Sequence, residues 1–543
     1  MVRPPKTMGL PNIPRARTGV AGLDEILGGG LPTDHLYLID GEPGTGKTTL
    51  GLQFLIEGAA NGERGLYITL SESSRELHAV AESHGWSLDG IDIFELSNDA
   101  VVDVQESYTI FHPAEVELQQ TMDRVLKSIE ERNPRRVVFD SLSEMRLLAR
   151  EPLRFRRQIL ALKQFFDKRE STVILLDDKT APETDMQLHS IAHGVIVLEH
   201  VALEYGSERR RLQLTKVRGI PFRGGYHDFR IVAGGLKVFP RILQDEHRTR
   251  PHHDQLLSGS DALDDLLGGG ITCGTSALIT GAAGTGKSVL CTQFAREELA
   301  HGGKVLFYLF DERLGTFRMR TSALGMSLEK DRDEGRLIMR QVEPTEMSPG
   351  EFANEVVNAV AEENVSLVII DSINGYMQSM PEERLLAIQI HELLSFLANN
   401  GVTCVMTLVQ HGIFGNPVEE AVDISYLADT VILLRYFEVT GTVRQAISVV
   451  KKRSGDHERM IRECRVQKGG LFVGEPLSEF HGVLTGVPQY TGGVAPLLAE
   501  QPASRWGGSE RRKSASDGDG REPDQHPKRT QRGSSDTRNQ PGR

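Results

Sequence analysis

An eight-residue stretch rich in glycine occurs twice in this 543-residue sequence, at positions 41–48 and 281–288. Each copy has the form Gly-x-x-Gly-Thr-Gly-Lys-Thr/Ser. In this pattern the glycines let backbone N–H groups close around phosphate oxygens, the lysine adds positive charge, and the last hydroxyl holds Mg²⁺. The residues that we expect to bind a nucleotide are Gly41, Gly44, Thr45, Gly46, Lys47, Thr48 and Thr49, and Gly281, Gly284, Thr285, Gly286, Lys287, Ser288 and Val289.

The flanking sequence supports two such phosphate-binding loops, or P-loops. A P-loop needs a strand before it and a helix after it. Short apolar runs at 36–39 and 277–280 are typical of strands, and the residues that follow each loop continue in a helical pattern. A helix ending in three glycines also precedes each loop at the same distance, so we infer that a whole domain is duplicated.

An aspartate ends an apolar strand further along each half, at Asp140 and Asp371. Taken alone, Asp-Ser after a strand is typical of turn chemistry. Beside a P-loop strand, however, such an aspartate can orient the water shell of Mg²⁺, which is the Walker B role. We therefore predict that Mg²⁺ is held by Thr48 with Asp140 and by Ser288 with Asp371.

Two further pairs of polar residues recur in both halves. The predicted strands 66–70 and 306–310 are followed by Ser71-Glu72 and by Asp311-Glu312. Later, each half carries a basic doublet on a predicted strand, with Lys216 and Arg218 in one and Lys451 and Arg453 in the other. A spacing of two places each doublet on one face of its strand. Such cations either belong to a solvated edge strand or complete the γ-phosphate site of a neighbouring subunit, as arginine fingers do.

Composition excludes several classes of protein. The formal net charge is −13 and the pI is about 5.8, so the chain as a whole repels nucleic acid and acidic lipid. No apolar run approaches the roughly 20 residues that span a bilayer, and the first 20 residues lack the apolar core of a signal peptide. Its four cysteines form no CxxC pair, which argues against a zinc site or a disulfide framework. We expect a cytoplasmic protein without a membrane segment or a nucleic-acid partner.

Apolar strands alternate with helical stretches through both halves, which predicts an α/β fold with a mostly parallel sheet covered by helices on both faces. We expect a flexible arm over 1–17, a first domain over 18–245, a second over 246–486 and a polar tail over 487–543. The tail is rich in Gly, Ser, Pro, Arg, Asp and Gln, and we predict that it is disordered because it has too few large apolar residues to form a core.

With these features the sequence resembles the KaiC family of double-domain RecA-like ATPases. The resemblance rests on the two P-loops, the GLDEILGGGLP and ALDDLLGGGI leaders, the segment 343–350, and the segment 424–430 before an apolar strand. It covers about residues 18–486 and implies a two-tiered homohexamer with ATP between subunits. It further implies slow ATP hydrolysis in the first ring, autokinase and autophosphatase activity in the second, and regulatory partners of the clock or signalling type. The two basic doublets match the family's trans-acting cations.

The sequence departs from the family pattern at two sites. The family carries adjacent acids after the strand that follows the P-loop, and the leading acid is credited as the base. Ser71 takes that place in the first domain and leaves Glu72, so we expect weaker water activation there, whereas the second domain has Asp311 and Glu312. The family's adjacent Ser-Thr phosphoacceptors correspond to Ser425 and Tyr426, which leaves Ser425 as the phosphoacceptor.

The sequence is therefore compatible with three functions. The first is an ATPase and serine autokinase that acts as a signalling hub. The second is a RecA-like DNA-handling motor, which would need a basic channel and salt-dependent DNA binding. The third is a catalytically weak switch in which ATP only holds an oligomer together.

Overall fold

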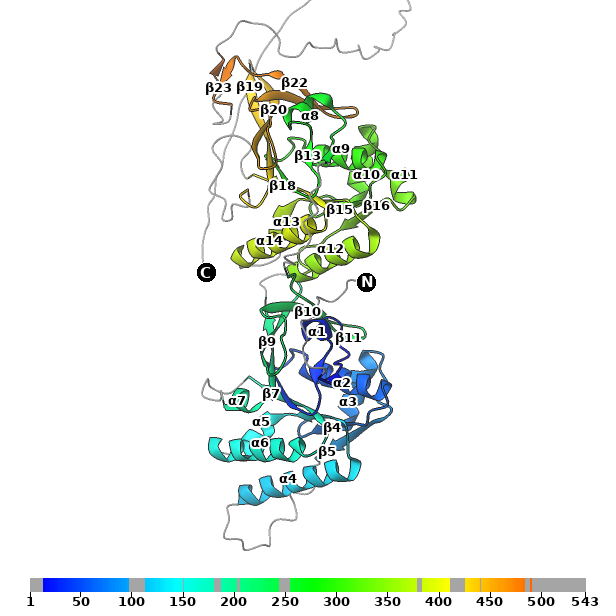
Figure 1. Ribbon diagram of the computed structural model, residues 1–543, viewed down its shortest axis with the longest axis vertical. Coiled ribbons are helices and arrows are strands. Elements are labelled where there is room, and N and C mark those ends of the chain that lie inside the picture. Colours follow the sequence, from blue (N-terminus) through cyan, green and yellow to red (C-terminus); the bar gives the residue numbers. More distant parts are fainter. Residues whose placement is uncertain are drawn as a thin grey trace, which may run out of the picture. The chain divides into compact units, whose positions relative to one another are not determined.

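The computed structural model describes residues 13–96, 113–149, 151–179, 187–202, 206–243, 254–377, 383–410, 425–439, 441–483 and 489–490 (Figure 1). The predicted tail over 487–543 lies outside these residues except for 489–490, and most of the predicted N-terminal arm lies outside them too.

The first half of the chain contains seven helices and eleven strands among its described residues. They are β1 Arg15–Ala16, α1 Leu23–Ile26, β2 Leu31–Pro32, β3 Leu36–Gly41, α2 Lys47–Ala60, β4 Gly65–Thr69, α3 Ser74–Ser83, β5 Ile91–Glu95, α4 Pro113–Arg132, β6 Arg136–Asp140, α5 Leu142–Ala149, α6 Pro152–Asp167, β7 Thr172–Asp178, α7 Gln187–Ile191, β8 Gly194–Val201, β9 Arg209–Val217, β10 Tyr226–Val232 and β11 Gly235–Phe239.

Among the described residues, the second half repeats this order with three differences: it has one extra short helix, α11, no counterpart of α7, and two short strands at its end. The elements are β12 Gln255–Leu256, α8 Asp261–Leu266, β13 Ile271–Thr272, β14 Ser276–Gly281, α9 Lys287–Ala300, β15 Val305–Leu309, α10 Leu314–Ala323, α11 Glu329–Asp333, β16 Leu337–Gln341, α12 Pro349–Glu363, β17 Leu367–Asp371, α13 Ile373–Met377, α14 Glu383–Asn399, β18 Thr403–Val409, β19 Thr430–Val439, β20 Thr442–Lys452, β21 Arg462–Gln467, β22 Gly470–Pro476, β23 Phe480–His481 and β24 Gln489–Tyr490.

Each half forms a nine-stranded sheet with the same topology. The strand order is β11-β10-β9-β8-β3-β7-β6-β4-β5 in the first sheet, and β22-β21-β20-β19-β14-β18-β17-β15-β16 in the second. The strands from β8 to β5, and from β19 to β16, run parallel, and the remaining strands continue each sheet as antiparallel neighbours. The predicted fold class, two α/β domains with mostly parallel sheets, is confirmed.

Both faces of each sheet are buried, as parallel strands require. Alternate residues of β3 face opposite sides, because successive side chains of a strand point to opposite faces. Tyr37 and Ile39 belong to the apolar cluster that includes α1, α2 and α3, whereas Leu36 and Leu38 belong to the cluster with α4, α5 and α6. This double burial explains why the strands appear in the sequence as continuous apolar runs.

The observed strands match the predicted ones to within one to three residues, with one larger difference. The apolar run from Thr430 to Leu434 predicts a strand that ends at Leu434, but β19 continues to Val439 because it pairs with β20 in a long antiparallel hairpin. Residues 435–439 are less apolar than those before them, so no continuous apolar run in the sequence marks this part of the strand.

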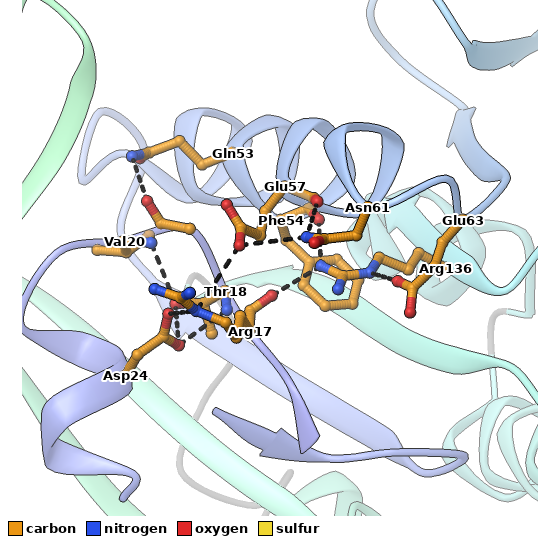
Figure 2. Close-up of polar contacts among 11 residues, drawn as sticks. Arg17, Thr18, Val20, Asp24, Gln53, Phe54, Glu57, Asn61, Glu63 and Arg136 are labelled. Carbon is orange, nitrogen blue, oxygen red and sulfur yellow. Dashed lines mark hydrogen bonds and ion pairs between the residues drawn. The ribbon is translucent and has the colours of Figure 1, made fainter. Parts of the chain in front are cut away.

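A polar network fixes the rear of the P-loop helix α2 in the first domain (Figure 2). The side chain of Arg136, at the start of β6, is 3 % exposed and forms an ion pair with Glu63. Its Nη1 donates to the carbonyl oxygens of Arg17 and Phe54, each at 2.7 Å. The network therefore joins the leader segment, α2 and β6 behind the phosphate-binding end of the helix.

Among the described residues, no helix combines the length and the apolar composition needed to cross a lipid bilayer.

Candidate nucleotide sites

The two P-loops have the same backbone shape. Gly46 and Gly286 precede the first helical residue with φ of 97° and 99°, in the left-handed region that favours glycine. A Cβ at Gly46 would also lie 2.8 Å from Cδ1 of Ile231. Each loop therefore turns sharply into a 14-residue helix, α2 or α9, whose free N–H groups and dipole favour a phosphate.

Side chains of the loops stabilise this shape. Thr45 Oγ1 donates to the carbonyl of Glu42 at 2.8 Å, and Thr285 Oγ1 donates to that of Ala282 at 2.9 Å. Lys47 and Lys287 each donate from Nζ to two loop carbonyls at 2.8 Å. Thr49 and Val289, in the first helical turn, are buried. The predicted nucleotide-binding residues therefore lie together in each domain.

The predicted magnesium residues also meet. Thr48 Oγ1 lies 3.3 Å from Asp140 Oδ2, and the Ser288 hydroxyl bonds to Asp371. Burial raises the pKa of both aspartates, because a carboxylate loses hydration there. A hydroxyl and a carboxylate fit Mg²⁺, which keeps water and phosphate as its other ligands. Among the described residues no group of three His, Cys, Asp or Glu side chains could hold a metal.

The two domains support Asp140 and Asp371 from opposite sides, which the sequence did not predict. The phenol of Tyr67, on β4, donates to Asp140. In the second domain Thr407, on β18, donates to Asp371 at 2.6 Å. The sequence shows that Phe307, which has no hydroxyl, stands where the first domain has Tyr67, but it does not show the contacts that Tyr67 and Thr407 make.

Glu72 is placed by a tight turn at the end of β4. Its N–H donates to Thr69 Oγ1 at 2.9 Å, and Ser73 then caps α3 with a capping box to Glu76. Oε2 of Glu72 is buried and has no hydrogen-bond partner among the described residues. Burial, with a further contribution from Asp140, raises the pKa of Glu72 to about 7. A carboxyl with this pKa can accept a proton near neutral pH.

The acids of the second domain are bound differently. Arg320 donates to both oxygens of Glu312, from Nε at 3.1 Å and from Nη2 at 2.8 Å. Ser372 donates to Asp311 through its hydroxyl. Because the guanidinium occupies both oxygens of Glu312, Asp311 is the better candidate base in this domain.

The basic doublets contact equivalent segments of their own domains. Lys216 and Lys451 are in β9 and β20, whereas Arg218 and Arg453 each follow a strand end by one residue, which corrects the prediction that both members lie on the strand. Lys216 donates to the carbonyl of His189, and Arg218 donates to that of Ser190 at 2.9 Å.

In the second domain the equivalent carbonyls are those of Ser425 and Tyr426. Lys451 Nζ donates to the carbonyls of Ser425 at 3.0 Å, Tyr426 at 3.3 Å and Ala428 at 2.7 Å. Arg453 donates to the carbonyl of Tyr426 at 2.8 Å. The candidate phosphoacceptor Ser425 therefore lies on a segment that the basic doublet holds.

Replacing Lys451 by alanine is expected to speed amide hydrogen exchange over residues 425–430 by roughly tenfold, because three carbonyl contacts to a charged donor are lost. Lys452→Ala is the matched control, since Lys452 Nζ donates instead to the carbonyls of Leu267 and Gly270. Equal exchange over 425–430 in both variants would contradict a specific role of Lys451.

A parallel sheet with a P-loop at the carboxyl end of a central strand and an aspartate on a nearby strand defines a P-loop NTPase, here present twice in one chain. A family model described as "ATPase: KaiC" matches residues 16–242 and 257–478. The chain therefore belongs to the KaiC family, which implies ATP binding and hydrolysis.

Several curated proteins are similar over most of this chain. A circadian clock oscillator protein KaiC of Picosynechococcus sp. is 27 % identical over 489 residues, which is 88 % of this chain and 92 % of the relative. The circadian clock protein KaiC3 of Synechocystis sp. is 26 % identical over 88 % of this chain and 95 % of its own length. The circadian clock oscillator protein KaiC 1 of Synechocystis sp. is 25 % identical over 88 % and 93 %.

Proposed function

We propose that this KaiC-family ATPase hydrolyses ATP in its first domain and phosphorylates Ser425 in its second, within a homohexamer that binds each ATP between subunits. The basic doublets would then face the γ-phosphate of a neighbouring subunit, as arginine fingers do.

The observation that carries this proposal is the contact between Lys451 and the Ser425 segment. If Lys451 and Arg453 approach a neighbour's γ-phosphate, they bring Ser425 with them. Strand register gives the first-domain counterpart: Tyr37 pairs with Gly194 and Ala277 with Thr430, which aligns His189 with Ser425. A hydroxyl therefore stands at this place in the second domain and an imidazole in the first, which favours serine phosphorylation in the second.

The transfer would proceed in line. The Ser425 oxygen forms a bond to the γ-phosphorus as the bond from that phosphorus to the β,γ-bridging oxygen breaks, and ADP leaves. Asp311 accepts the hydroxyl proton, and Lys287 balances charge on the phosphate oxygens. Burial lowers the pKa of Lys287 to about 8, so at neutral pH the lysine is still mostly protonated. Mg²⁺, held by Ser288 and Asp371, would neutralise charge on the β- and γ-phosphates.

Hydrolysis in the first domain would use Glu72 as the base that takes a proton from water, with Lys47, Thr48 and Asp140 in the roles of Lys287, Ser288 and Asp371. Because several relatives carry circadian clock names, we propose a role as a clock-type or signalling hub read by regulatory protein partners.

Native mass spectrometry with and without ATP and Mg²⁺ tests the proposal by reading subunit number and added phosphate together. We expect six subunits with the nucleotide, fewer without it, and added phosphate that is lost in Ser425→Ala. The Ser425→Ala chain should still form the hexamer, because Lys451 contacts the backbone carbonyl of residue 425, which alanine retains.

A hexamer with no phosphate on any second-domain hydroxyl would contradict the proposed kinase activity and favour a catalytically weak switch. A chain that stays monomeric with saturating ATP would also contradict the proposal that ATP binds between subunits.

A further inference from the structure

The P-loop lysines of the two domains have different neighbours. Lys47 Nζ lies 2.7 Å from Oδ1 of Asp178, and the side chain of Lys47 is only 8 % exposed. Lys287 Nζ donates to loop carbonyls in the same way as Lys47, but no carboxylate within the described residues lies at ion-pair distance from it. Among the described residues, the first P-loop therefore contains an ion pair that its duplicate lacks.

Strand register explains this difference. In the first sheet Gly41 of the P-loop pairs with Asp178, the last residue of β7. In the second sheet Gly281 pairs with Val409, the last residue of β18. The same place beside the P-loop is thus a carboxylate in the first domain and an isopropyl group in the second.

Neighbouring residues hold Asp178 toward the loop. The N–H of Asp178 donates to Ser143 Oγ at 3.2 Å, and this hydroxyl lies 3.3 Å from Oδ2 of Asp178. The adjacent acid, Asp177, pairs instead with Arg146. The two consecutive aspartates share Ser143, whose hydroxyl lies 3.3 Å from an oxygen of each, but their ion pairs differ, and Asp178 is the one that pairs with Lys47.

The carboxylate of Asp178 also acts on the other acids of the first site. Its charge raises the pKa of both Glu72 and Asp140, after the larger effect of burial. A phosphate that binds Lys47 must exchange with Asp178 and then lie near these three carboxyl groups. A divalent cation would offset that repulsion, since it lowers the charge of the incoming nucleotide and attracts the acids.

We propose that Asp178 is a specificity-determining residue that makes the first site accept a nucleotide only together with a divalent cation, whereas the second site, with Val409 in that place, also accepts the metal-free nucleotide. This inference rests on the proposed nucleotide and Mg²⁺ roles of the two sites.

Equilibrium dialysis of the full-length chain with labelled ADP tests it. With Mg²⁺ we expect two ADP per chain. With EDTA we expect one ADP per chain. This binding should be lost in Lys287→Ala and retained in Lys47→Ala. Asp178→Val should tighten metal-free ADP binding at the first site by roughly tenfold, because Lys47 is left without this competing partner. The reciprocal Val409→Asp should weaken metal-free binding at the second site by a similar factor.

Asp177→Asn is the matched control and should leave ADP binding unchanged in EDTA, because Asp177 pairs with Arg146 rather than with Lys47. If Asp178→Asn, Asp178→Val and Val409→Asp all bind Mg²⁺–ADP normally but leave metal-free binding unchanged, the role of Asp178 is wrong. If the unaltered chain binds no ADP even with Mg²⁺, the proposed function fails instead.

Discussion

Replacing Glu72 by glutamine is expected to lower ATP hydrolysis by the first domain by roughly a hundredfold, the usual size of a lost general base. One oxygen of Glu72 is buried without a hydrogen-bond partner among the described residues, and the pKa of its carboxyl is raised to about 7. The turnover of a Lys287→Ala chain, in which the second P-loop is disabled, measures this domain alone.

The same carboxyl gives this turnover a pH dependence. A general base must be ionised, and Glu72 loses its proton as the pH rises through about 7. Turnover should therefore rise between pH 6 and pH 8 in the Lys287→Ala chain, and Glu72→Gln should remove that rise.

Glu312→Gln in a Lys47→Ala chain is the control in the other domain. It should have a smaller effect on hydrolysis, because Arg320 already occupies both oxygens of Glu312. Equal losses in the two variants, or no loss in Glu72→Gln, would contradict the role of Glu72. The sequence led us to expect weaker water activation in the first domain because Ser71 replaces an acid, whereas the environment of Glu72 favours an active base there.

Replacing Arg136 by alanine is expected to lower the free energy of unfolding by about 3 kcal/mol or more. The guanidinium donates to two carbonyls at 2.7 Å, pairs with Glu63, and lies 4.6 Å from the centre of the Phe54 ring. Its loss would leave these buried carbonyls without their donor. The midpoint temperature of the transition in which the first domain unfolds should fall by about 6–12 °C, as measured by differential scanning calorimetry.

Arg135→Ala is the matched control, one residue earlier in the chain. Arg135 pairs with Glu170 at 2.7 Å, but these side chains are 46 % and 83 % exposed. An exposed ion pair contributes about 0–1 kcal/mol, so the transition should hardly move. A similar fall in both variants would show that burial of the Arg136 network does not stabilise the domain as proposed.

Much of the fold could be predicted because its signals are local. The P-loops, the glycine-ended helices before them and the apolar strands recur in register, and the strands are buried on both faces. The positions of Asp140 and Asp371 could be predicted because each ends such a strand. The end of β19 did not follow, because hairpin pairing rather than burial extends it.

The sequence alone determined the duplicated P-loop domain and predicted the residues of each phosphate loop and the hydroxyl and aspartate proposed to hold Mg²⁺, because short motifs fix the backbone near them. Only the tertiary structure decided how the two sites differ: Asp178 beside Lys47, Arg320 on Glu312, and Tyr67 or Thr407 on the aspartates. Those partners come from other strands and helices, and strand register, which no local pattern encodes, sets which side chains meet.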